Sequence, residues 1–343
     1  PFSIRGEHLI GQEMFKVMDR AQLLEREGHH VYHLELGNPR MPPPAEIINA
    51  TVAAIKAKQL GYAPMAGIVE LRAALASRYV QMTGRQLAER HVVISPANLL
   101  ISQFLDLTCN PGDRIGLFTP AFPSYLAAAS HIGLEVVSVP LSLENGFHLA
   151  ESHINAAIDA RPRAIILNSA NNPTGAVYTR PILELLAQRC EEEGIWLLSD
   201  ETYAELSFGW PFFSLASRES PQLVVLSSFS KLFSIPGYRI GYAVAHPAVA
   251  DKLALSTSTL ISCLPIFTQL GCLAGLSVID QYIERVKFHC NRVTSDCAAL
   301  INRSGILHCA SPESGFYLFV DISGTGVNDM AFCKRLLEER QTA

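Results

Sequence analysis

The chain contains little charge and no long hydrophobic run. Only 17% of its 343 residues are Asp, Glu, Lys or Arg, whereas 49% are hydrophobic, a balance that excludes a disordered chain and allows a large core. No stretch reaches the roughly 18 apolar residues of a membrane helix, and the N-terminal PFSIRGEHLIGQEMF lacks the apolar segment of a signal peptide. We therefore expect a cytoplasmic protein with no membrane partner.

Clustered positive charge and closely paired cysteines are also absent. The net charge is -5 and the Lys and Arg residues are scattered, which leaves no basic surface for nucleic acid. The eight cysteines include no C-x-x-C pair, so we expect free thiols in a reducing compartment. His29, His30 and His33 lie close together without a matching cysteine or carboxylate cluster, and we expect surface or domain-packing histidines and no metal.

Short apolar runs alternate with helical periods from about residue 68 to residue 245. This alternation predicts an α/β fold with a mostly parallel, seven-stranded sheet flanked by helices. Helical spacing predicts helices over residues 68–82 and 180–193. The strand candidates are near-continuous apolar runs, as buried strands require: 91–95, 114–118, 134–140, 164–168, 195–199, 223–227 and 239–245.

Strand signals become sparse after residue 245. Residues 278–304 repeat apolar side chains on one helical face, and we interpret them as one long helix that leads into a second domain. One strand, 315–322, and one helix, 329–340, follow. We place a large domain at residues 40–285 and a smaller α+β domain at residues 1–39 and 286–343, and we expect its C-terminal part to be incomplete.

Polar motifs occur at the C-terminal ends of four predicted strands, the edge where open α/β sheets bind ligands. Three of them have an ordinary alternative explanation: a lysine after a strand is usually solvated, an Asp-Glu pair often caps a helix, and Asn, Pro and Gly together form turns. Only their joint order favours a shared site. The motifs are residues 95–98, NNPTG at 171–175, DETY at 200–203 and SFSK at 228–231.

Together with YRIGY at 238–242, these motifs resemble those of the fold-type-I enzymes that use pyridoxal 5′-phosphate (PLP), specifically the class I and II aminotransferases. YAPMAGI at 62–68 and NPGD at 110–113 extend the resemblance, which spans residues 35–320. The resemblance implies that PLP is the cofactor. PLP must be held by its phosphate, its ring and its aldehyde carbon at once.

The resemblance implies three catalytic residues. Lys231 would carry PLP as a Schiff base and then, once the substrate has displaced it, move the proton at the substrate Cα. Asp200 would keep the pyridine nitrogen protonated, which makes the ring an electron sink. Tyr203, together with Asn172, would donate a hydrogen bond to the phenolic oxygen of PLP.

The other implied contacts hold the phosphate and the ring. The backbone N–H groups of Ala97 and Asn98 at a helix N-terminus would bind the phosphate dianion, with the hydroxyls of Ser228 and Ser230 and the guanidinium of Arg239. Phe122 would stack on the pyridine ring. Tyr62 would reach the phosphate of a neighbouring subunit, which implies a homodimer with shared active sites.

On the substrate side, the resemblance implies contacts from Gly37 and Asn172. The sequence departs from the family pattern at Pro96, which has no N–H to donate where a glycine is usual, and the arginine that grips the substrate α-carboxylate is not found before Ala343. We interpret the chain as an aminotransferase that moves an amino group between an amino acid and a 2-oxo acid by a ping-pong mechanism. Another fold-type-I PLP enzyme (a lyase, decarboxylase or cyclising biosynthetic enzyme) is the alternative, and a non-catalytic effector domain is a weaker one.

Overall fold

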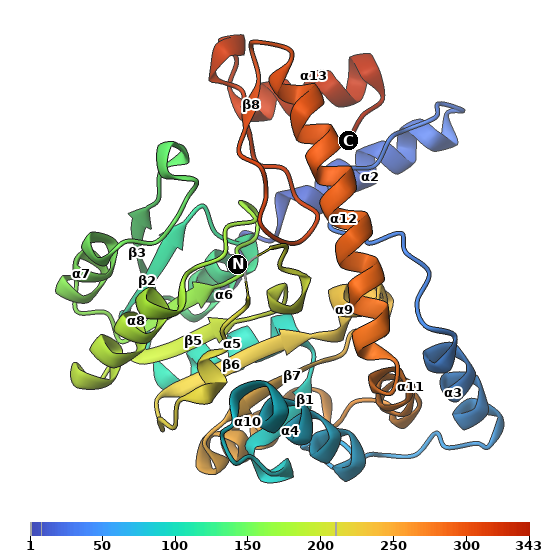
Figure 1. Cartoon of the computed structure of the whole chain (residues 1–343), viewed down its shortest axis with the longest axis vertical. Helices are drawn as coiled ribbons and strands as arrows, with labels where there is room; N and C mark the ends of the chain where they lie inside the picture. Colours follow the sequence, from blue (N-terminus) through green and yellow to red (C-terminus); the bar gives the residue numbers. More distant parts are fainter. Residues whose placement is uncertain (1, 8, 210) are drawn as a thin grey trace.

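A seven-stranded sheet forms the centre of the computed structural model, which describes residues 2–7, 9–209 and 211–343 (Figure 1). Strands β2 to β6 run parallel, and β7 is antiparallel to both of its neighbours, in the order β1-β7-β6-β5-β4-β2-β3. The mostly parallel sheet is therefore confirmed. Its strands are β1 (Val92–Ser95), β2 (Arg114–Thr119), β3 (Glu135–Pro140), β4 (Ala164–Asn168), β5 (Trp196–Asp200), β6 (Leu223–Ser228) and β7 (Gly241–Ala245).

Helices cover both faces of the sheet because the buried strands carry apolar side chains on both sides. In β4, Ile165 and Leu167 join one hydrophobic core, and Ala164 and Ile166 join the opposite one. The first core includes residues of α4 (Val69–Thr83), α7 (Glu151–Asp159) and α8 (Arg180–Glu192). The second includes residues of α5 (Ala97–Thr108), α6 (Pro123–Ile132) and α10 (Pro247–Ile261).

Among the remaining helices, those that begin at Ala45, Phe229, Ile266 and Ile279 add buried residues to the first core, and the others lie near the ends of the chain. The long α12 begins beside α11 and runs away from the sheet toward β8 (His308–Cys309) and α13, where α2 also lies (Figure 1). Arg20 of α2 and Glu338 of α13 form an ion pair with an N–O distance of 2.7 Å. These elements are α1 (Ile4–Glu7), α2 (Glu13–Arg26), α3 (Ala45–Lys56), α9 (Phe229–Leu232), α11 (Ile266–Leu276), α12 (Ile279–Asn302) and α13 (Asp329–Arg340).

Two predicted strands were wrong in part. The strand predicted over 239–245 begins only at Gly241, because Arg239 has a left-handed backbone with φ of 53° that ends the preceding turn. The strand predicted over 315–322 shortens to β9 (Val320–Asp321), which pairs with β8 (His308–Cys309), a strand that the sequence did not predict. Residues 315–319 have no ladder partner and run toward the cavity described below.

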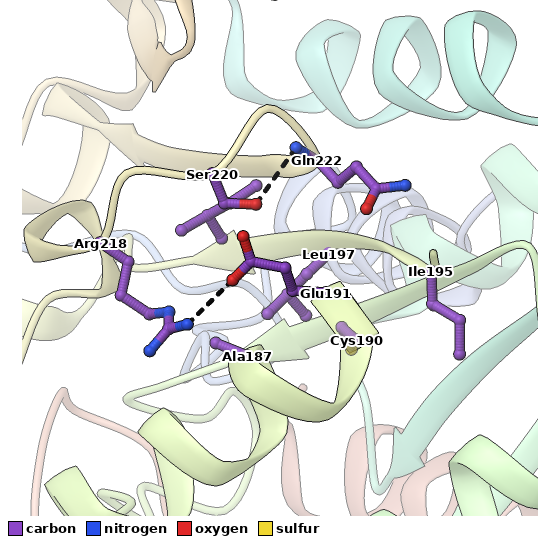
Figure 2. A pocket seen from close by; sticks show the side chains of 9 residues that line it. Ala187, Cys190, Glu191, Ile195, Leu197, Arg218, Ser220 and Gln222 are labelled. Atoms are coloured by element: carbon purple, nitrogen blue, oxygen red, sulfur yellow. Dashed lines mark hydrogen bonds and ion pairs between the residues drawn. The ribbon is translucent and has the colours of Figure 1, made fainter. Parts of the chain in front are cut away.

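A small cavity of about 10 Å³ lies between α8 and the ends of β5 and β6 (Figure 2). Its volume is close to the least that holds one water molecule. Arg218 Nη2 donates to Glu191 Oε2 over 3.0 Å beside it, and the Gln222 N–H donates to Ser220 Oγ over 3.4 Å. We interpret this cavity as a packing gap closed by a surface ion pair.

All eight cysteines are free thiols, as predicted. Within the described ranges no single helix is long and apolar enough to span a membrane. Among the described helices, the pair α11 and α12 meets that length and composition when taken together, and the two helices are bent by 82°. His33 lies between two carboxylates, with Nδ1 2.9 Å from Glu35 Oε1 and Nε2 3.2 Å from Glu25 Oε1, and it joins the N-terminal segment to α2.

Candidate active site

One cavity of about 1240 Å³ opens at the C-terminal ends of the parallel strands, between the sheet, the N-terminal segment and residues 316–319. It collects side chains from stretches that are far apart in the sequence, because the carboxyl ends of parallel strands share one sheet edge. All the site residues named from the sequence line it, except Tyr62: Gly37, Ala97, Asn98, Phe122, Asn172, Asp200, Tyr203, Ser228, Ser230, Lys231 and Arg239.

Asp200 is the buried acid of this cavity, at the last position of β5. Its Oδ2 accepts a hydrogen bond of 2.7 Å from the Tyr125 hydroxyl, and its Oδ1 accepts one of 3.0 Å from the Thr202 N–H. Burial raises the pKa of Asp200, whereas the bonds from Thr202 and Tyr125 act to lower it. A buried carboxylate without an ion pair in the described chain is suited to a cationic N–H partner.

Lys231 lies in the short helix α9, directly after β6. Its Nζ donates to the carbonyl oxygen of Gly37 from the N-terminal segment. Burial, and then the positive charge of Arg239, lower the pKa of Lys231 to about 8. The amine is therefore neutral in a larger fraction of molecules near neutral pH than an exposed lysine is, and a neutral amine can attack a carbonyl.

The anion-binding end of the cavity is formed by α5, α9 and the turn before β7. Gly241 lets β7 approach the first turn of α5, because a Cβ at this position would lie 3.1 Å from the Ala97 nitrogen and 2.8 Å from the Ser227 oxygen. Ser228 caps α9 by accepting a bond of 3.1 Å from the Ser230 N–H. The exposed guanidinium of Arg239 donates to the Pro236 oxygen over 2.9 Å, which leaves further N–H groups free for an anion.

Tyr317 is a site residue that the sequence reasoning missed. Its hydroxyl contacts the hydroxyl of Tyr203 and accepts a bond of 3.3 Å from Asn172 Nδ2. Burial raises the pKa of Tyr317 to about 12, so the hydroxyl stays protonated. Gly37 completes the arrangement, because any Cβ there would collide with the Tyr317 hydroxyl.

Tyr125 is the second residue that was missed. Phe122 precedes the first turn of α6, and its ring meets that of Tyr125 edge to face, with centroids 5.6 Å apart. The spacing of three residues at a helix start was the available signal, since it places both side chains on the same side of the helix. Tyr125 thus connects the aromatic wall of the cavity to Asp200.

Tyr62 does not line the cavity of its own chain. Its side chain is 89% exposed, in the loop between α3 and α4. It is therefore available to another molecule and not to the site built by this chain.

The donor set of the cavity fits PLP. A buried carboxylate suits the pyridine nitrogen, a desolvated amine suits the aldehyde carbon, and a helix N-terminus with two hydroxyls and an arginine suits the phosphate. The three groups belong to one cavity whose volume exceeds that of a cofactor alone, and it leaves room for a substrate.

Comparisons with known proteins agree with this chemistry. The family described as Aminotransferase class I and II matches residues 29–342. An aspartate aminotransferase of Musicola paradisiaca is 29% identical over 92% of this chain and 80% of its own length. The arginine–pyruvate transaminase of Pseudomonas aeruginosa is 30% identical over 96% and 84%. The Thermus thermophilus aspartate aminotransferase with maleate has a TM-score of 0.93 and 27% identity, covering 100% of this chain and 90% of that one.

Proposed function

The chain belongs to the class I and II aminotransferase family, and from that premise we propose how its own residues serve transamination. Members are PLP-dependent transferases of fold type I that move an amino group between an amino acid and a 2-oxo acid by a ping-pong mechanism. The bound cofactor supplies an electron-withdrawing ring that stabilises negative charge at the substrate Cα. The observation that carries the proposal is the meeting of Lys231, Asp200 and the anion-binding end in one cavity.

Lys231 is the residue we assign to covalent capture of the cofactor and to proton transfer. Its lowered pKa favours the neutral amine, which would condense with the aldehyde carbon of the cofactor and release water. Once the amine of the substrate had displaced it, the free Lys231 amine would take and return the proton at the substrate Cα. The Gly37 carbonyl oxygen accepts a hydrogen bond from Nζ, which holds the amine in the cavity. Gly37 thereby lies beside the reacting carbon, on the substrate side.

Asp200 is assigned to the ring nitrogen. The hydrogen bonds from Tyr125 and Thr202 stabilise the charged form of Asp200. A proton shared between Asp200 and the ring nitrogen would offset the free-energy cost of burying the carboxylate. Asn172 and Tyr203 are assigned to the phenolic oxygen, and Phe122 to the ring face. Asn172 and Tyr203 both contact the Tyr317 hydroxyl, which fixes the positions of these two neutral donors.

We assign the phosphate to Ala97, Asn98, Ser228, Ser230 and Arg239. The first N–H groups of α5 have no partner within the helix, and Arg239 adds a permanent charge. Pro96 lies at the N-cap and contributes no donor, so the arginine and the two serines carry more of this contact.

We also propose a homodimer that completes each site with Tyr62 of the second copy. The exposed ring of Tyr62 is surrounded in sequence by other exposed apolar side chains, and those of α3 recur on one helical face. They are Ile48, Val52, Ile55, Leu60, Met65 and Val69. The free cysteines support a reducing compartment, and we propose the cytoplasm.

The relatives differ in their amino donor, since one is named for aspartate and another for arginine. The test of the proposed function is the absorbance spectrum of the purified chain with PLP, before and after single amino acids. We expect an absorbance band at about 420 nm that converts to one at about 330 nm when an active donor is added. Lys231→Ala should bind no PLP that borohydride can trap, and an active Lys231→Ala protein would refute the assignment.

A further inference from the structure

We propose that Arg40 binds the side-chain carboxylate of a dicarboxylic substrate, so that the preferred donors and acceptors carry a second carboxylate. The inference rests on the transamination proposed above and adds the substrate class. Arg40 lines the same cavity as Lys231 and Asp200, yet none of the roles assigned above uses it.

Arg40 lies close along the chain to a residue that contacts the reacting amine. Arg40 follows Gly37 by three residues on the N-terminal segment, and the Gly37 carbonyl accepts the hydrogen bond from Lys231 Nζ. Three residues of chain span at most about 10 Å, so the Cα of Arg40 lies within that distance of Gly37, and the arginine side chain lines the same cavity. The guanidinium therefore has the reach to contact the far end of a substrate whose Cα lies at the amine of Lys231.

Arg40 also differs from the other cationic side chains of the cavity in its contacts with the described residues. Lys231 donates to Gly37, and Arg239 donates to Pro236. Arg40, in contrast, is exposed at the cavity and makes no side-chain hydrogen bond or ion pair with the residues that the structure describes. A guanidinium presents a fork of N–H donors that matches a carboxylate in two parallel hydrogen bonds.

The charges that line the cavity also favour an anionic substrate side chain. Besides Asp200, the acidic residue that lines the cavity is Glu35, which would favour a basic substrate if its carboxylate were free. One oxygen of Glu35 is bonded to His33, and the other is enclosed by protein and inaccessible. Arg40 is thus the available charge for a substrate side chain, and it selects an anion.

The test compares dicarboxylic with neutral amino acids on the PLP-loaded chain. We expect kcat/KM for L-aspartate or L-glutamate to exceed that for L-alanine and L-leucine. Arg40→Gln should lower kcat/KM for the dicarboxylic donors by about 10- to 100-fold, the range that the loss of a charge-assisted hydrogen bond produces. The same variant should change kcat/KM for the neutral donors by less than about threefold. Arg40→Lys, which keeps the charge, should restore part of the loss.

A binding measurement separates this role from catalysis. Succinate should bind the loaded protein more tightly than butyrate in calorimetry, and Arg40→Gln should remove that difference. Arg292→Gln, at an exposed position of α12, is the matched control and should change neither ligand.

Three results would overturn the proposal. An equal loss for dicarboxylic and neutral donors would place Arg40 at the α-carboxylate, and no loss for either would remove it from substrate binding. A wild-type preference for neutral or basic donors would contradict the substrate class. A chain that fails to bind PLP or to transaminate any amino acid would instead refute the proposed function itself.

Discussion

The ionised form of Asp200 depends on the hydroxyl of Tyr125. Because the hydrogen bond of 2.7 Å acts to lower the pKa of this buried carboxyl, Tyr125→Phe should raise that pKa further. We expect the acidic limb of the kcat/KM profile to move to higher pH and kcat/KM at neutral pH to fall about 10-fold, the scale of one hydrogen bond to a charged group. The pH profile of the loaded enzyme measures both.

Tyr178→Phe is a matched control for this change. The Tyr178 hydroxyl is also buried, and it has no hydrogen-bond partner within the described ranges. Its removal should leave activity, pH profile and stability nearly unchanged. If the two variants behaved alike, the bond from Tyr125 to Asp200 would have no role in the chemistry.

The amine of Lys231 should govern the pH dependence of cofactor capture. Its pKa is lowered to about 8 from 10.5, and the neutral form is the one that reacts, so the rate of covalent PLP capture by the cofactor-free protein should rise with pH and level off above about 8. Arg239→Gln should move the midpoint upward, because the Arg239 charge contributes to the lowering. A wild-type midpoint near 10 would contradict the burial of the amine.

Single residues also show where the sequence was sufficient. Motifs that follow strands predicted Lys231, Asp200 and Asn172 in the cavity, because a parallel sheet brings its strand ends to one edge. Tyr125 and Tyr317 were missed for a different reason. A buried tyrosine resembles a core residue in sequence, and only the fold shows that its hydroxyl meets a polar site.

At the scale of elements, residues 315–319 pack against the N-terminal segment at Gly37. Gly37→Ala should displace the Tyr317 hydroxyl, since the added Cβ would collide with it, and we expect kcat/KM to fall more than about 10-fold. The double variant Gly37→Ala with Tyr317→Phe should recover part of the loss, because it removes the colliding oxygen. Steady-state kinetics of the four proteins measure the coupling.

The same segment shows where an apolar pattern in the sequence fails to predict a strand. Residues 315–322 form a near-continuous apolar run of the kind that predicts a strand, but β8 offers a ladder partner only to Val320 and Asp321. The preceding residues are held by other contacts, such as the bond of 3.1 Å from the Gly315 N–H to the Leu206 oxygen. In contrast, the bounds of α13 and β4 agree with the predicted ones, because their patterns end at clear signals on both sides.

For the whole molecule, the proposed dimer explains why a residue of the predicted site lies outside the cavity. One chain provides the amine, the acid and the anion-binding end, whereas Tyr62 is 89% exposed on the loop between α3 and α4. A second copy that covers this loop would bury the apolar side chains around it. Its own Tyr62 would reach the cavity of the first chain. Such an isologous contact creates two equivalent shared sites.

Mixing two inactive variants tests this arrangement directly. Lys231→Ala removes the amine from one chain, and Tyr62→Ala removes the ring that we assign to its neighbour. In a mixed dimer one site loses both groups and the other keeps both, so equal amounts of the two variants, unfolded and refolded together, should regain about a quarter of wild-type activity. Each variant refolded alone should remain at its own low activity. If the mixture gave only the mean of the two, while sedimentation showed dimers of the 37.5 kDa chain, Tyr62 would act within its own subunit or not at all.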